Sequence, residues 1–107
     1  MKNLNKVKKY EADNYFLRNL RHYNSFYQNN KIIDLINETS LQANSILEIG
    51  CANGIMLNHY SKILNSKNNY GVDFSRKAIA HGKKKFKNLK LYNYSSLEID
   101  KLKKNLT

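Results

Sequence analysis

The chain has 107 residues, of which 19 are basic and 8 acidic, and its formal net charge is +11 at pH 7. This length suits one domain or part of one. A single cysteine excludes a disulfide framework within the chain, and no segment approaches the roughly 18 consecutive apolar residues of a membrane-spanning helix. One cysteine and three scattered histidines also lack the ligand spacing of a zinc site. These features favour a cytoplasmic globular protein, and its charge makes RNA a candidate partner.

The first part of the chain is expected to be helical. Aromatic and apolar side chains predict a helix over Glu11–Tyr27, and a second helix is expected at Asn30–Asn37. The apolar face of the first helix would consist of Tyr15, Phe16, Leu20, Tyr23 and Tyr27. We therefore expect residues 1–40 to form a helical cap or lid segment in front of the main domain, residues 41–107.

A strand leading into a small-residue turn is the most informative part of the sequence. The apolar side chains of Ser45–Ile49 favour a buried strand. Gly50, Ala52 and Gly54 follow it, and such small residues leave backbone amides uncovered for a ligand to approach. A helix is expected next, at Ile55–Asn65. Its inner face is predicted to hold Met56, Tyr60, Ile63 and Leu64.

A second short strand, Asn69–Asp73, ends in an acid. A carboxylate at this position can accept hydrogen bonds from both hydroxyls of a ribose, and charged acceptors make the stronger bonds. Two strands with a helix between them, a glycine turn after the first and an acid after the second, predict a βαβ nucleotide site.

The remaining elements continue the alternation. Ser75 is a suitable N-cap for a helix that extends to Phe86. Its inner face is predicted to hold Ala78, Ile79, Gly82 and Phe86. A third strand is expected at Leu89–Asn93, and Leu97–Leu106 is expected to be a loop with a short basic helix.

Two segments carry a family resemblance. Leu47–Gly54 resembles motif I of the class I S-adenosylmethionine-dependent methyltransferases, and Tyr70–Ser75 resembles their second motif. The resemblance implies an S-adenosylmethionine site formed by Glu48, Gly50, Cys51, Ala52, Asn53, Gly54, Asp73, Phe74 and Ser95. By this resemblance, the turn would run under the methionine part of the cofactor. Asp73 would hold the ribose hydroxyls, and Phe74 would pack on the adenine. Ser95 aligns best with an acid that often bonds the adenine amino group in the family.

The turn differs from the usual dinucleotide fingerprint. Ala52 stands where G-x-G-x-x-G requires its second glycine, and it also replaces the middle glycine of the methyltransferase turn. Glu48 would oppose a pyrophosphate but suits the ammonium group of S-adenosylmethionine. These residues favour the methyl donor over NAD. The alternative interpretation is an ordinary turn, with Glu48 and Asp73 as solvated strand ends.

The resemblance implies an α/β, Rossmann-like fold that has about seven strands in the order 3-2-1-4-5-7-6. The sequence supplies only the first three of these strands, so we expect a fold truncated after the third strand, with residues 41–107 forming a partial cofactor-binding domain. The strand Ser45–Ile49 would then be an unpaired apolar edge. Such an edge predicts self-association or pairing with a partner chain.

The function implied is methyl transfer from S-adenosylmethionine to a small-molecule or sugar acceptor. The sugar hypothesis depends on Tyr15–Asn19, which loosely resembles the start of methyltransferases from surface-polysaccharide gene clusters. An RNA methyltransferase or basic RNA-binding module is one alternative, and an inactive truncated remnant is another. No catalytic residue is assigned, and His59 and His81 are expected to face outward or along the flanks of their helices, as surface histidines. Whether the chain is itself an enzyme is left open, because the catalytic base normally comes from the later half of the fold.

Overall fold

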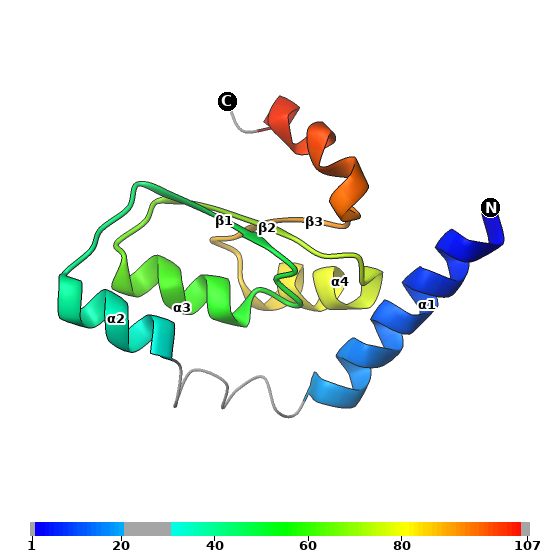
Figure 1. Ribbon diagram of the computed structural model, residues 1–107, viewed down its shortest axis with the longest axis horizontal. Helices are drawn as coiled ribbons and strands as arrows, with labels where there is room; N and C mark the ends of the chain where they lie inside the picture. Colours follow the sequence, from blue (N-terminus) through cyan, green and yellow to red (C-terminus); the bar gives the residue numbers. More distant parts are fainter. Residues whose placement is uncertain (1, 21–30, 106–107) are drawn as a thin grey trace.

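The computed structural model describes residues 2–20 and 31–105 (Figure 1). The elements are α1 (Lys2–Asn19), α2 (Lys31–Thr39), β1 (Ser45–Ile49), α3 (Ile55–Ile63), β2 (Asn68–Val72), α4 (Arg76–Lys85), β3 (Lys90–Tyr92) and the 3₁₀ helix η2 (Ser96–Asn105). The chain thus alternates between strands and helices after α2, as the sequence predicts.

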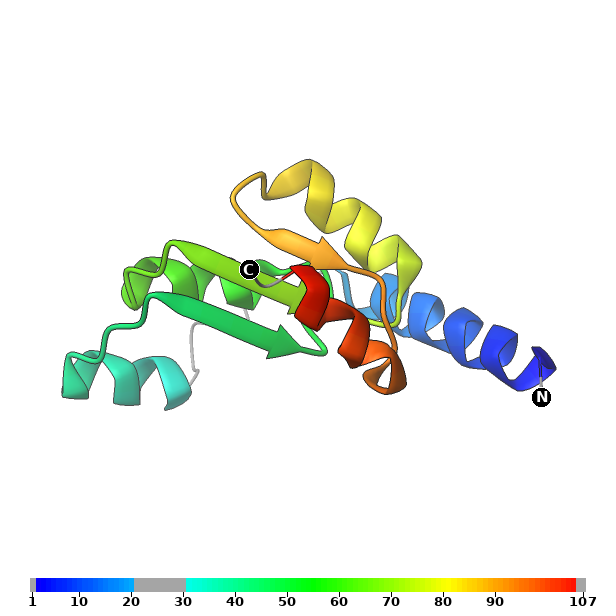
Figure 2. The ribbon, with the colours of Figure 1, turned by 90° about the horizontal axis from the view of Figure 1, so that it is seen from above.

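The three strands form one parallel sheet in the order β1-β2-β3. Ile46 of β1 lies beside Asn69 of β2, and Tyr70 of β2 lies beside Lys90 of β3. Helices α2, α3 and α4 lie on one side of the sheet and η2 on the other (Figure 1). Figure 2 shows α1 beyond the carboxyl ends of the strands. This arrangement is the α/β, Rossmann-like class expected from the sequence.

Two apolar clusters hold the helices on the sheet. The larger one consists of Cys51, Leu57, Ile79, Leu89 and Leu91, with Ile46 and Phe86 packed against it. The second cluster joins α1 to the rest of the domain, because Phe16 packs there with Ala78, Leu20, Ala52 and Ile55. Phe16 is only 3% exposed. Burial of such an aromatic side chain contributes about 1.5–3 kcal/mol, so α1 is docked on the domain.

The predicted start of the first helix was wrong. The helix α1 begins at Lys2 and ends at Asn19, so it includes the basic segment before Glu11. Four of the nine residues from Lys2 to Tyr10 are lysine, which is a good helix former, and this propensity supports a helix here without an apolar stripe. The predicted continuation through Tyr23 and Tyr27 lies outside the described residues.

The predicted inner face of the helix that follows the turn is confirmed at Leu64 and wrong at Met56, Tyr60 and Ile63. Leu57, Ser61 and Leu64 are buried, whereas Met56, Tyr60 and Ile63 are half-buried. The reason is that α3 is covered from two directions, by the sheet and by α2. A helix between two neighbours buries a wider arc than a single apolar stripe indicates.

The strand β1 lies at one edge of the three-stranded sheet. Its side chains alternate, with Ile46 and Glu48 turned toward the helices and Leu47 and Ile49 exposed at 44% and 58%. Within the described part of the chain, no strand pairs with the outer edge of β1. The exposed apolar edge predicted from the sequence is therefore present, and pairing of this edge with another chain remains a prediction.

The helix α4 begins at a cap that also fixes α1. Ser75 Oγ accepts a hydrogen bond from the backbone N–H of Ala78 at 3.1 Å and donates one to Asp13 Oδ1 at 2.6 Å. The same Asp13 oxygen accepts the N–H of Lys77 at 3.1 Å. Partial burial of Asp13 disfavours its charged form, but the bonds from Ser75 and Lys77 outweigh this and lower its pKa. The predicted N-cap is confirmed, and it links two helices.

Replacing Ser75 by alanine should lower the free energy of unfolding by about 1–2 kcal/mol, because one change removes the N-cap and the bond to Asp13. Urea denaturation followed by circular dichroism would measure the loss. Ser66→Ala is the matched control, since the Ser66 hydroxyl makes only a long 3.4 Å bond to the Asn68 carbonyl in an exposed turn. Equal stability of the two variants would contradict the proposed linkage.

Candidate functional site

The turn after β1 is fixed to the end of β2 by backbone hydrogen bonds. The N–H groups of Gly50 and Cys51 both donate to the Val72 carbonyl, at 2.7 and 3.1 Å. Gly50, Ala52 and Gly54 have positive φ angles of 78°, 52° and 89°. Glycine adopts this left-handed conformation without a Cβ clash, whereas alanine adopts it at a cost of about 1–2 kcal/mol. Ala52 thus holds the backbone shape that a glycine would favour.

Asp73 stabilises the shape at Ala52. Its Oδ2 accepts the N–H of Ala52 at 2.8 Å, and its Oδ1 accepts the N–H of Ser75 at 2.8 Å. A carboxylate offers about four acceptor positions, so two remain for a ligand. The carboxylate lies at the carboxyl end of β2, which is where parallel α/β sheets bind ligands. Asp73 therefore stabilises the turn, and it is also a candidate hydrogen-bond acceptor for a ligand.

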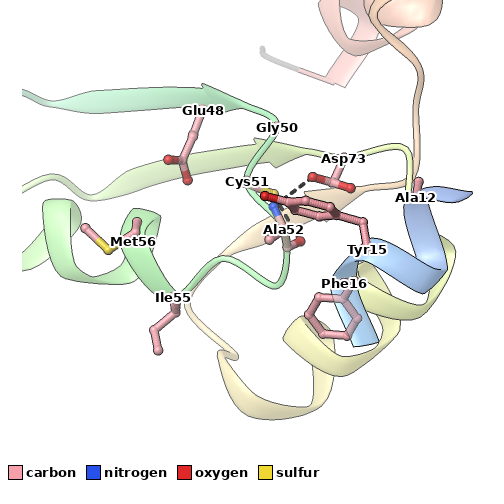
Figure 3. A pocket seen from close by; sticks show the side chains of 10 residues that line it. All are labelled: Ala12, Tyr15, Phe16, Glu48, Gly50, Cys51, Ala52, Ile55, Met56 and Asp73. Carbon is pink, nitrogen blue, oxygen red and sulfur yellow. Dashed lines mark hydrogen bonds between the residues drawn. The ribbon is translucent and has the colours of Figure 1, made fainter. Parts of the chain in front are cut away.

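A pocket of about 250 Å³ opens beside the turn (Figure 3). It is lined by Ala12, Tyr15 and Phe16 of α1, by Glu48, Gly50, Cys51 and Ala52 of β1 and the turn, by Ile55 and Met56 of α3, and by Asp73. Most of its lining is apolar, as is usual for small-molecule sites. The helix α1 thus forms one wall of the pocket, and a lid function of residues 1–40 remains a prediction.

Glu48 is the unusual group of this pocket. Figure 3 shows its side chain reaching from β1 into the pocket toward Met56, with Asp73 on the other side of the turn. Its Oε1 atom is buried and has no hydrogen-bond partner among the described residues. Burial, and next the nearby charge of Asp73, raise the pKa of Glu48 to about 7. A cationic group placed in the pocket would satisfy this oxygen and favour its charged form.

Two further hollows continue from this pocket along the ends of the strands. The second is about 260 Å³ and is lined by Ile49, Gly50, Val72, Asp73, Phe74 and Tyr94. The third is about 340 Å³ and is lined by Lys9, Phe74, Ser95, Leu97 and Glu98. The first and second share Gly50 and Asp73, and the second and third share Phe74. An elongated ligand could therefore lie from Glu48, past Asp73, to Phe74 and Ser95.

Three of the predicted cofactor residues have internal roles in the structure. Asn53 is only 1% exposed, and its Oδ1 accepts the N–H of Ile55 at 3.2 Å. The Cβ position of Gly54 points at Leu89, at 2.7 Å from its Cδ1 atom. Cys51 lines the pocket but is 4% exposed, and burial together with the charges of Asp73 and Glu48 raises the pKa of its thiol well above the usual range. A thiol that stays protonated is not a nucleophile.

Sequence reasoning missed Glu98. Residues 93–96 contain no acid, yet the chain folds back so that Glu98 Oε1 accepts the N–H of Ser95 at 3.2 Å. Glu98 therefore lines the third hollow beside Ser95 and Phe74. The signal was present in the sequence, because Ser95 followed three residues later by glutamate has the spacing of a capping box.

Sequence reasoning placed His81 outward or on a flank of its helix and did not predict its contacts. His81 is half-buried, its ring lies edge-on to Phe16 at 5.7 Å, and its Nδ1 lies 3.2 Å from Asn53 Nδ2. Because Asn53 Oδ1 accepts the N–H of Ile55, its Nδ2 is the donor and His81 Nδ1 the acceptor. His81 thus connects α1, α4 and the turn through its ring.

Two other features of the described residues bear on the kind of site. No group of three or more His, Cys, Asp or Glu side chains gathers in residues 2–20 and 31–105 in a way that could hold a metal ion. None of the helices in those ranges has the length and apolar character needed to cross a bilayer.

Comparisons with known proteins find a similarity among solved structures. The sequence matches no protein-family model and no curated protein. Among solved structures, the chain is similar to an S-adenosylmethionine-dependent methyltransferase from Clostridium acetobutylicum ATCC 824, with 22% sequence identity and a TM-score of 0.49. The similarity covers 60% of this chain and 27% of that one. The chain thus spans about a quarter of that protein's length.

Proposed function

We propose that the chain binds S-adenosylmethionine and supplies the cofactor-binding part of a methyltransferase. The observation that carries the proposal is the order of chemical groups along the three neighbouring hollows, which share lining residues. An unpartnered carboxylate oxygen of Glu48 lies at one end, Asp73 in the middle and the Phe74 ring at the other end. An ammonium group, a ribose and an adenine ring occur in this order in S-adenosylmethionine.

Each part of this ligand finds a suitable group. Glu48 can accept from the ammonium group, and charge-assisted bonds of this kind are about twice as strong as neutral ones. Asp73 retains acceptor positions for the ribose hydroxyls while it holds the turn. Phe74 is half-buried between the second and third hollows, where it can stack on a base.

The acceptor proposed is a small molecule, and a sugar is the favoured class. Its support is the Tyr15–Asn19 segment, in which Tyr15 and Phe16 line the first pocket. Methyl transfer from a sulfonium is a displacement that depends on positioning the two reactants. We assign this chain the positioning of the donor and assign no residue as the catalytic base.

Titration calorimetry with S-adenosylhomocysteine tests the cofactor proposal, with NAD as a competing nucleotide. We expect wild-type chain to bind S-adenosylhomocysteine and to bind NAD at least about tenfold more weakly, because Glu48 repels a pyrophosphate. Asp73→Asn should lower the affinity by about tenfold or more, since an amide nitrogen cannot accept hydroxyl or amide protons. Asp34→Asn is the control, because Asp34 lies on the exposed face of α2 and the charge change is the same.

A second variant separates ligand contact from damage to the turn. Phe74→Ala removes the stacking surface and leaves the Asp73 hydrogen bonds to Ala52 and Ser75 in place. Phe74→Ala should weaken the binding of S-adenosylhomocysteine by about tenfold, while the circular dichroism spectrum stays that of wild type. A folded wild-type chain that binds neither ligand, or that prefers NAD, would contradict the proposed function.

A further inference from the structure

Most of the net positive charge of this protein lies in one segment. Residues 74–97 hold seven of the 19 basic residues and none of the 8 acidic ones, so this segment carries +7 of the net charge of +11. The segment contains α4, whose ten residues include no acid.

The cations of α4 lie on its solvent face. Successive residues of a helix are turned by about 100°, so Arg76, Lys77, Lys83 and Lys84 fall within an arc of about 120°. All four are exposed, and the buried residues Ala78, Ile79 and Gly82 lie opposite. We call these four side chains the α4 stripe. Lys85 lies on the flank, where its Nζ is 5.5 Å from the centre of the Phe86 ring.

Acids neutralise only the beginning of the α4 stripe. Asp13 accepts the N–H of Lys77 and its charge acts on Arg76 and Lys77. Lys83 and Lys84 form no ion pair with any described residue. The last turn of α4 therefore presents its charge to solvent without an acidic neighbour on the same helix.

We propose that the α4 stripe binds the phosphate backbone of a nucleic acid. From Arg76 to Lys84 a helix rises about 12 Å, which spans about three to four successive phosphates at the 3.4 Å spacing of one strand. A row of cations with no interleaved acids is the electrostatic footprint of such a surface. A membrane surface fits less well, because a helix that lies in a bilayer needs an exposed apolar face and the apolar face of α4 is in the core.

The surface is separate from the proposed cofactor site. None of the four side chains lines the three hollows described above. Nucleic-acid binding should therefore survive Asp73→Asn, and the binding of S-adenosylhomocysteine should survive neutralisation of the stripe. Each proposal can therefore fail in these experiments while the other is supported.

Fluorescence anisotropy of labelled oligonucleotides tests the proposal. The probes are a single-stranded RNA of about 20 nucleotides, a duplex RNA and a duplex DNA of the same length, titrated with the full chain at several salt concentrations. The triple variant Arg76→Gln, Lys83→Gln and Lys84→Gln is compared with Lys31→Gln, Lys62→Gln and Lys67→Gln. Both variants lose three exposed cations, and the second set lies outside α4.

We expect wild-type chain to bind at least one probe, and the stripe variant to bind it about tenfold or more weakly. For single-stranded RNA, the slope of log affinity against log salt should fall by about two, at about 0.7 for each lost phosphate contact. The comparison among the three probes distinguishes RNA from DNA as the source of the phosphates. Circular dichroism establishes that both variants remain folded.

Three results would overturn the proposal. The first is equal weakening by the two triple variants, which would mean diffuse attraction by net charge. The second is tighter binding of wild-type chain to phosphatidylserine vesicles than to any oligonucleotide, which would assign the stripe to a membrane. The third is the absence of binding to all probes by folded wild-type chain at about 50 mM salt, where phosphate contacts are strongest.

Discussion

Gly82→Ala is expected to lower the free energy of unfolding by about 3 kcal/mol, a large share of the roughly 5–15 kcal/mol that stabilises a domain. A Cβ at Gly82 would lie 2.1 Å from the backbone oxygen of Asn53 and 2.6 Å from Leu91 Cδ1. The Leu91 side chain can move, but the Asn53 carbonyl belongs to the turn. The added methyl group therefore forces α4 away from the turn that forms the pocket.

The sign of this effect distinguishes packing from helix propensity. In an open helix, alanine is favoured over glycine by about 1 kcal/mol, so propensity alone predicts that Gly82→Ala stabilises the protein. Ala80→Gly is the control, because Ala80 is exposed on the same helix and its change reports the propensity term. Urea denaturation of the two variants gives both values. A Gly82→Ala variant more stable than wild type would contradict the close approach of α4 to Asn53.

Glu48→Gln is expected to stabilise the ligand-free protein by on the order of 3 kcal/mol at pH 8 and to change little at pH 4.5. The pKa of Glu48 is raised from 4.5 to about 7 in the folded state, chiefly by burial and next by the charge of Asp73. Each unit of such a shift corresponds to about 1.4 kcal/mol. Glutamine resembles the neutral acid and has no charge to bury.

The sign of the pH dependence of stability follows from proton binding to Glu48 in the folded and unfolded states. Between pH 4.5 and about pH 7, the folded state holds a proton on Glu48 that the unfolded state has lost. The contribution of Glu48 to stability therefore falls as pH rises through this window. Thermal or urea unfolding of wild type and Glu48→Gln at pH 4.5, 6 and 8 would measure the growing difference. Glu38→Gln is the control, because Glu38 is exposed on α2, and a constant difference across pH would contradict the prediction.

Glu48→Gln, which should stabilise the empty protein, should weaken the binding of a ligand that carries an ammonium group. S-adenosylhomocysteine carries an ammonium group, so its affinity for wild type should rise with pH through about 7 as Glu48 ionises. Methylthioadenosine lacks that group, and its affinity should show no such rise. Glu48→Gln should remove the pH dependence for the first ligand and leave the second unchanged. The charged form of Glu48 thus lowers the stability of the empty protein and strengthens the binding of the proposed ligand.

The elements near the turn could be predicted from the sequence because their signals are local. The strand Ser45–Ile49 has the same bounds in the structure, since an apolar run ends there at a glycine turn. Ser75 caps α4 as predicted, because its hydroxyl bonds an amide three residues away. The βαβ nucleotide interpretation placed Glu48, Gly50 and Asp73 around one pocket, and the structure brings them together.

The other parts of the site could not be predicted because they depend on contacts between distant segments. The burial of Phe16, its contact with His81 and the bond from His81 to Asn53 join three elements that are far apart in sequence. The spacing of apolar residues within α1 or within α4 does not predict these contacts. Glu98 is an exception, since the three-residue spacing between Ser95 and Glu98 is a local signal of a capping box.

The bond between Asp13 and Ser75 has a consequence for the order of assembly. It joins residues separated by 62 positions, whereas the βαβ contacts between β1 and β2 close a loop of about 23 residues. Closing a longer loop carries a greater entropic cost, although the cost grows only with the logarithm of loop length. We infer that the sheet and its turn form first and that α1 docks on them afterwards. The pocket wall that α1 provides is then also the first part to open, so access to the site can be regulated without unfolding the sheet.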